Sequence, residues 1–215
     1  MTAKIKFIQQ IATTSLLREY KIMRTTQLST ALVLAIAACS SAQAQQFTQV
    51  VSFGDSLSDA GNVAYYQNII LGNPAFFLGN SWTTNPDSVH SQYLSQLLGL
   101  SLQNYSFAGG SNYAYAGACA MANGTVTAAG VFNCYLPFPS VTQQVSGYIT
   151  ANGGQVDPTK IYTLWAGAND IRTGAGISAG AAQAFAGQSA ATTVGLAGAL
   201  LNAGAKTVVV FNLPD

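Results

Sequence analysis

Charged side chains are scarce in this chain: Asp, Glu, Lys and Arg make up 7% of its 215 residues, whereas hydrophobic residues make up 49%. Most of the basic residues lie near the N-terminus, since five of the eight precede residue 25: Lys4, Lys6, Arg18, Lys21 and Arg24. After residue 44, three basic residues face six aspartates, which leaves a formal charge of −3. No basic patch remains to bind a phosphate backbone, which argues against nucleic acid as a partner.

Histidine and cysteine are also rare. His90 is the one histidine, and Cys39, Cys119 and Cys134 are the three cysteines. Cys119 and Cys134 have no histidine nearby in the sequence, which argues against a metal site. They are separated by 14 residues rich in Gly, Ala, Thr and Asn. A disulfide would pin this loop by about 3 kcal/mol in an oxidising compartment, and two buried free thiols are the alternative.

Residues 1–44 are typical of a secretory leader. Arg24 is followed by an apolar run over residues 28–38 and then by Ala-Gln-Ala at residues 42–44, which fits a signal-peptidase site. A signal peptide can be laid out from Met23, with the residues before it as an upstream extension. The apolar run is shorter than the roughly 20 residues that a transmembrane helix needs. We therefore expect export to the periplasm, the outer membrane or the extracellular space.

The position of cleavage has two interpretations. Cleavage after Ala44 would leave a mature domain over residues 45–215. Alternatively, Ile-Ala-Ala-Cys at residues 36–39 resembles a bacterial lipobox. Cys39 would then be a lipidated N-terminus in contact with a membrane.

The sequence Gly-Asp-Ser-Leu-Ser-Asp-Ala-Gly-Asn at residues 54–62 follows an apolar, β-branched run. A strand here would end beside Ser56, and Ser58 and Asp59 are suited to cap a following helix. Open α/β sheets bind their substrates at the carboxyl ends of the strands, and the N–H groups of a helix start favour negative charge. Ser56 is therefore the candidate nucleophile, and an ordinary capping serine is the alternative.

Hydrophobic periodicity predicts the other elements. Helices are expected over residues 88–98, 139–151 and 178–202, buried strands over residues 161–165 and 207–211, a strand-like segment over residues 108–118 and an irregular loop over residues 64–87. Short apolar strands that alternate with helices are typical of a parallel sheet. The fold class predicted for residues 45–215 is one α/β domain with helices on both faces of that sheet.

The helix predicted over residues 88–98 has apolar side chains that can share one core-facing side: Val89, Tyr93, Leu94, Leu97 and Leu98. His90 lies on the same helix. This setting indicates a packing or surface role for His90 rather than that of a catalytic base.

Two more segments place candidate residues at strand ends. Gly117 follows the alternating tyrosines of residues 108–118, and its N–H could donate to an oxyanion; the alternative is a tightly packed, Gly-rich strand end. Asn169 and Asp170 follow the strand predicted over residues 161–165. The Asn169 amide would point into the same crevice as Ser56, unless the two residues form only a turn and a helix cap.

In this order, GDSLSDAGN at residues 54–62, GGSNYAYAGA at residues 109–118 and GAND at residues 167–170 resemble the GDSL or SGNH family of secreted esterases and lipases. The resemblance is to the bacterial branch related to autotransporter lipases. It implies the flavodoxin-like, three-layer α/β/α fold of SGNH hydrolases and no metal or organic cofactor. It also implies that Ser56 is the nucleophile, with an oxyanion hole formed by the N–H groups of Ser56 and Gly117 and the side-chain amide of Asn169.

One family feature is absent from the sequence. Family members carry an Asp-x-x-His block near the C-terminus, whose His takes the serine proton and whose Asp orients the His. No such block is present in residues 1–215, and neither Asp215 nor His90 is expected to replace it. We therefore expect a truncated chain that lacks the last part of the fold. Loss of the histidine costs about 10⁶ in turnover in a serine hydrolase.

The leading functional hypothesis is an exported serine ester hydrolase. It would act on small-molecule or lipid carboxylic esters through an acyl-serine intermediate. The alternative is an exported protein of the same fold that binds acyl or glycan ligands without turnover.

Overall fold

The computed structural model describes residues 47–73, 75, 80–134 and 138–213. The expected leader, with Cys39 and its cleavage site, lies outside the described residues, as does Asp215. Residues 1–46 and 47–215 cluster as two separate units.

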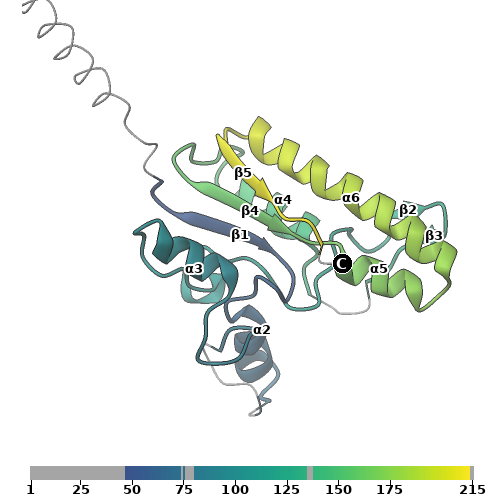
Figure 1. The fold of residues 1–215 in the computed structure, drawn as a ribbon, viewed down its shortest axis with the longest axis horizontal. Helices are drawn as coiled ribbons and strands as arrows, with labels where there is room; N and C mark the ends of the chain where they lie inside the picture. The colour runs from purple at the N-terminus through teal and green to yellow at the C-terminus, as the bar shows by residue number, and fades with distance from the viewer. Residues whose placement is uncertain (1–46, 74, 76–79, 135–137, 214–215) are drawn as a thin grey trace, which may run out of the picture. The chain divides into compact units, whose positions relative to one another are not determined.

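Three parallel strands form the central sheet: β1 (Val50–Gly54), β4 (Ile161–Trp165) and β5 (Thr207–Val210), in the order β1-β4-β5. Gly54 pairs with Trp165, and Leu164 pairs with Val210. Because the strands run in the same direction, their carboxyl ends meet at one edge of the sheet (Figure 1). Parallel strands need long crossover connections, which are usually helical, and helices lie between these strands in the chain. The parallel sheet that we predicted is confirmed.

Helices cover both faces of this sheet. α4 (Val141–Ala151) and α6 (Ala179–Asn202) pack on the face that carries Val51, Phe53, Tyr162 and Leu164. α3 (His90–Leu97) lies on the opposite face, over β1, on the near side of the sheet in Figure 1. The three-layer α/β/α arrangement therefore holds for the described domain.

The two longest helices begin where serine caps them. The Ser140 hydroxyl accepts the N–H of Gln143, whose side chain accepts the Ser140 N–H in return, and the Ser178 hydroxyl accepts the N–H of Ala181. By length and composition alone, α6 is apolar enough to cross a membrane. It buries Phe185 and Leu200 in the domain, as core helices also do.

The face that we predicted for α3 is wrong. Tyr93 and Leu97 are 46% and 85% exposed, whereas Ser91, Gln92 and Ser95 are buried. The reason is the polar layer beneath the helix, where the Gln92 amide donates to the carbonyl oxygen of Gln103. Helical periodicity finds the apolar side of a helix, but the surface that receives the helix decides which side is buried.

The loop expected over residues 64–87 is partly helical. α2 (Asn62–Tyr65) continues directly into a π-helical turn, η1 (Tyr66–Ile70). A further short helix, α5 (Ala168–Ala175), carries Asn169 and was not predicted as an element of its own. Segments of this length give too few residues for a periodic pattern.

The strand-like segment over residues 108–118 forms only isolated bridges, in which Asn112 is paired with Ser52 and with Tyr105. Its backbone still follows β1, because the N–H of Tyr113 donates to the oxygen of Ser52 and that of Tyr115 to the oxygen of Gly54.

The remaining elements are short: η2 (Ser106–Ala108) and the two-residue strands β2 (Val126–Thr127) and β3 (Gly130–Val131).

The strand predicted over residues 207–211 is not buried as expected. β5 is half-buried, and Val210 is 44% exposed. β5 is the last strand in the sheet order, and no described segment pairs with its outer edge. Edge strands leave one row of backbone groups unpaired.

Candidate active site

Ser56 lies in a tight turn directly after β1. The Ser58 N–H donates to the backbone oxygen of Asp55 (3.0 Å), and the Leu57 N–H donates to the Asp55 carboxylate (3.0 Å). Ser56 itself is half-buried, and neither its hydroxyl nor its N–H has a hydrogen-bond partner among the described residues. Both groups of Ser56 are thus left available to a ligand.

Three separate parts of the fold hold this turn. The side-chain amide of Asn112 donates to the backbone oxygen of Ser58 (2.7 Å). The Ser58 hydroxyl is hydrogen-bonded to Nε2 of His90 (2.9 Å), the first residue of α3. Gln144 of α4 accepts the Gly54 N–H (2.9 Å) and donates to the Gly54 oxygen (3.0 Å). None of these three positions was predicted as part of the site.

Asp59, rather than Ser58, caps the start of α2. Its carboxylate accepts the N–H groups of Gly61 (2.8 Å), Asn62 (2.7 Å) and Val63 (3.2 Å). It also accepts the N–H of Ala116 at 2.8 Å. Burial raises the pKa of Asp59, while these four hydrogen bonds oppose the rise. Asp59 therefore ties the Ser56 turn to the residue before Gly117.

Gly117 bends away from β1 with a φ of 82°, a backbone conformation that favours glycine. Its neighbours are bonded, because the N–H of Ala116 donates to Asp59 and that of Ala118 donates to the oxygen of Tyr115. Within the described part of the chain, the Gly117 N–H has no acceptor. An unbonded N–H between bonded neighbours is suited to receive an oxyanion.

Asn169 lies in the first turn of α5, after Gly167 with its φ of 122°. Its side-chain amide donates to the oxygen of Ala118 (2.9 Å) and lies 3.5 Å from the Asp55 carboxylate. Asn169 thus contacts the residue after Gly117 and the residue before Ser56. The structure brings all three predicted oxyanion residues together at the carboxyl ends of the strands.

Two buried carboxyl groups lie beside this cluster. Desolvation raises the pKa of Asp55 to about 6, and the charge of Asp170 adds to the rise. Desolvation also raises the pKa of Asp170 to about 6, against the N–H groups of Ala120 (2.8 Å) and Met121 (3.0 Å) that it accepts. Asp170 thereby fixes the chain that follows Gly117.

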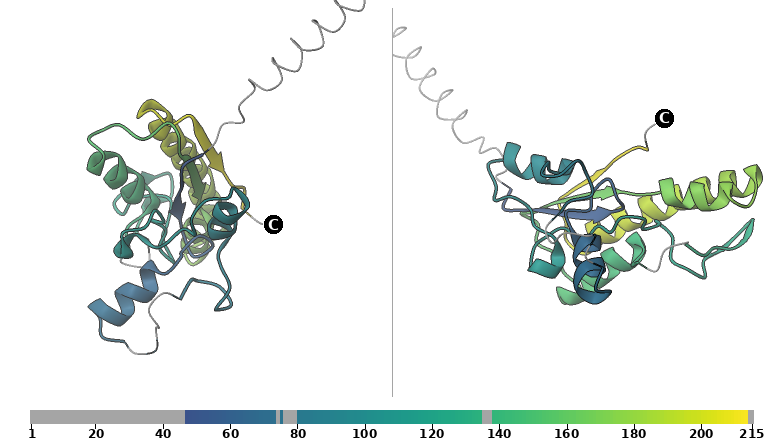
Figure 2. Two further views of the ribbon diagram at one scale, coloured as in Figure 1. Left: turned by 90° about the vertical axis from the view of Figure 1, so that its left-hand side faces the viewer. Right: turned by 90° about the horizontal axis from the view of Figure 1, so that it is seen from below.

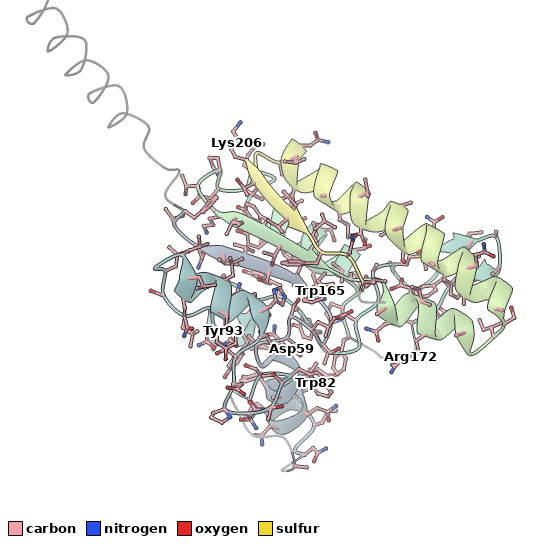
Figure 3. The ribbon with its side chains drawn as sticks, viewed as in Figure 1. Asp59, Trp82, Tyr93, Trp165, Arg172 and Lys206 are labelled. Carbon is pink, nitrogen blue, oxygen red and sulfur yellow. A yellow bond between two sulfur atoms is a disulfide. The ribbon has the colours of Figure 1, made fainter. Side chains whose placement is uncertain are left out.

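His90 is not placed as a base for Ser56. Its imidazole is packed edge-on against the rings of Trp165 and Phe211, each with centroids 4.8 Å away. Burial lowers the pKa of His90 to about 4. Figure 3 shows Trp165 and Asp59, which lie more than 100 residues apart in the sequence, at the same end of the sheet. Among the described residues, no histidine or carboxylate hydrogen-bonds to the Ser56 hydroxyl.

The structure contains a disulfide between Cys119 and Cys134, with a Cα–Cα distance of 6.0 Å. Cys119 is buried with Met121, Phe132 and Phe185. This pair closes the loop that begins two residues after Gly117. No group of three or more metal-ligating side chains occurs in the part of the chain that the structure describes.

The position of Gln144 on its helix is a signal that could have been found in the sequence. It lies beside Val141, Val145 and Tyr148 on the buried side of α4. A polar residue on the apolar side of a predicted helix requires a buried partner. The sequence could therefore indicate that such a partner exists, but only the fold identifies it as Gly54.

The chain is similar to known proteins. Residues 50–215 match the model of a family described as GDSL-like lipase/acylhydrolase. The chain is 33% identical over 185 residues to Lipase 1 of Photorhabdus luminescens, an alignment that covers 86% of this chain and 24% of that protein. This chain thus spans about a quarter of the relative's length.

Proposed function

Because this chain belongs to the GDSL-like lipase/acylhydrolase family, we propose that it is a serine ester hydrolase with Ser56 as its nucleophile. One observation carries the proposal. An unbonded Ser56 hydroxyl, two unbonded N–H groups and the Asn169 amide meet at the carboxyl ends of the strands. This combination is suited to a reaction in which negative charge develops on a carbonyl oxygen.

The proposed reaction is acyl transfer in two steps. The Ser56 oxygen attacks the ester carbonyl, and the resulting oxyanion is held by the N–H groups of Ser56 and Gly117 and by the Asn169 amide. The alcohol leaves with a proton, and an acyl-serine ester remains. Water then attacks that ester, which releases the acid and restores Ser56.

The Ser56 proton needs a general base, and no described residue is placed to accept it. His90 is engaged with Ser58 and is held neutral by burial. We therefore assign the base to a histidine outside these 215 residues, as the family resemblance implies. Without that histidine, turnover would be lower by about 10⁶.

We also propose that the protein acts after export, on small-molecule or lipid esters. The apolar run and the small residues before Gln45 support export. The disulfide between Cys119 and Cys134 supports it as well, because such bonds persist in oxidising compartments.

The test is labelling by a fluorophosphonate together with hydrolysis of a soluble short-chain nitrophenyl ester. We expect Ser56→Ala to abolish both in protein isolated at full length from its source, while Ser101→Ala, at an exposed serine, leaves both unchanged. Residues 1–215 alone should label slowly. Labelling that survives Ser56→Ala would refute the nucleophile, and full turnover by residues 1–215 would refute an external base.

A second candidate function is binding of acyl or glycan ligands without turnover. The absence of a base for Ser56 among the described residues favours it. Experiments on the full-length protein distinguish the two functions. Hydrolysis that depends on Ser56 supports the enzyme, and saturable ligand binding without hydrolysis supports the binding protein.

A further inference from the structure

The segment formed by α2 and η1 ends in three exposed aliphatic side chains. Ile69, Ile70 and Leu71 are 49%, 55% and 58% exposed. Figure 1 and the left view of Figure 2 show this segment, drawn in blue, projecting from the rest of the described domain. Consecutive apolar residues at the end of a projecting segment are typical of an interaction surface.

The opposite end of the segment is firmly attached to the candidate site. The Asn62 amide donates to the backbone oxygens of Asn112 (2.8 Å) and Ala114 (2.9 Å), and its oxygen accepts the Ser106 hydroxyl (2.9 Å). Val63 is buried, whereas the residues of η1 are half-buried or exposed. The apolar end is therefore presented on a fixed base that shares its contacts with the Ser56 turn.

Aromatic rings link this segment to the oxyanion residues. Tyr65 of α2 stacks on Phe107 with a centroid distance of 4.8 Å. Phe107, 44% exposed, contacts Tyr115 edge-on at 6.1 Å. Tyr115 lies two residues before Gly117. A partly exposed apolar path thus runs from the projecting segment to the place where an ester carbonyl would bind.

The charge pattern indicates a lipid surface as the occupant. The chain has no charged residue and no histidine between Asp59 and Asp87. In the same stretch, Trp82 is 49% exposed and lies beside α2 in Figure 3. Aliphatic residues at the end with Tyr and Trp behind them match a bilayer interface, where charge is costly and amphipathic rings are favoured.

A second protein fits this surface less well. A stable protein interface buries about 800 Å² on each partner. Three half-exposed aliphatic residues present far less than that area, but insertion into lipid needs only a few apolar side chains.

We propose that Ile69, Ile70 and Leu71 insert into a phospholipid surface and hold the Ser56 turn beside it. The proposed hydrolysis does not include this step, and the step needs no turnover. Binding can therefore be measured in Ser56→Ala protein, while hydrolysis is measured separately on a soluble ester. Failure of one does not imply failure of the other.

The experiment measures co-flotation of the chain with phosphatidylcholine vesicles. We expect Ile69→Gln/Ile70→Gln to lower the vesicle partition coefficient by about tenfold or more, since two large aliphatic side chains lose their apolar phase. The matched control is Ile177→Gln/Val194→Gln, whose side chains are 66% and 69% exposed elsewhere in the domain. This control should bind as the parent does. Residues 1–46 are common to every variant, so a difference in binding between variants comes from the substitutions.

Several outcomes overturn the proposal. Equal binding by Ile69→Gln/Ile70→Gln and its parent would do so, as would an equal loss in the Ile177→Gln/Val194→Gln control. If the substitutions at Ile69 and Ile70 instead dissociate a dimer in sedimentation without lipid, the surface is an interface between copies. Should that double variant fail to fold by circular dichroism, Leu71→Gln is measured in its place and must weaken binding by at least about threefold.

Discussion

Nε2 of His90 lies 2.9 Å from the hydroxyl oxygen of Ser58, two residues beyond the candidate nucleophile. The only histidine in the sequence is therefore used to hold the turn rather than to activate it. A neutral imidazole suits this role, because it packs edge-on against the rings of Trp165 and Phe211, which stack on each other. His90 joins α3 to the end of β1 through the side chain of Ser58.

The contact with His90 predicts a pH dependence of stability. The pKa of His90 is about 4 in the folded chain, against 6.5 without burial. Between these values the unfolded chain binds a proton that the folded chain does not, so the His90 contribution to stability is lost as the pH falls. Comparing urea unfolding at pH 7.5 and pH 4.5, we expect the native chain to lose about 2 kcal/mol more than His90→Gln.

The matched control for His90 is Tyr93→Gln, an exposed position on the same helix. It should keep the pH dependence of the native chain. Asp55 and Asp170 act in the opposite direction, because their raised pKa values make stability fall as the pH rises from 3.8 to about 6. The comparison between variants removes their effect. Parallel pH profiles for native and His90→Gln chains would contradict the prediction.

Replacing the single polar side chain of Gln144 is expected to cause a large loss of stability. Gln144→Ala removes a donor and an acceptor from the buried backbone of Gly54. We expect the free energy of unfolding to fall by about 2–4 kcal/mol in denaturant titration. Ser146→Ala, at an exposed position of α4, should change it by less than about 0.5 kcal/mol. A change equally small for Gln144→Ala would mean that water replaces the glutamine at no cost.

Because the chain contains a disulfide, its free energy of unfolding is expected to depend on reductant. Replacing both Cys119 and Cys134 by Ala should lower the free energy of unfolding by about 3 kcal/mol, given their sequence separation of 15 residues. Dithiothreitol should produce a similar loss in the native chain and none in the double variant. A native chain whose unfolding ignores dithiothreitol would show that the bond does not form in solution.

Replacing Asn169 is expected to lower the rate of ester hydrolysis without weakening substrate binding. Asn169→Ala removes one of the three proposed oxyanion donors and should lower kcat by about 10²–10³ with little change in KM. The measurement needs full-length protein that carries its base, with thermal unfolding as a check, because the Asn169 amide also bonds to the oxygen of Ala118. A loss below about threefold would remove Asn169 from the oxyanion hole.

Short-range chemistry allowed much of the fold to be predicted, and it also provided the candidate residues of the site. Alternating apolar strands and helices indicated the parallel sheet, and the strand expected over residues 161–165 coincides with β4. Ser56, Gly117 and Asn169 could be proposed because turn and strand-end residues are recognisable one segment at a time. The short helices α2 and α5 were missed, since a few residues give no period.

By itself, the sequence determined the class of the fold, the three strands of the parallel sheet with the longer helices, and the three motifs that resemble those of ester hydrolases, because each depends on residues close together in the chain. Only the tertiary structure decided how they are joined. Asp59 binds the N–H before Gly117, Gln144 binds Gly54, and His90 binds Ser58 rather than Ser56. The buried side of α3 was decided in the same way, by the polar layer beneath it. The contacts of Asp59, Gln144 and His90 span 57, 90 and 32 residues of sequence, and no local pattern encodes which buried polar group will satisfy another.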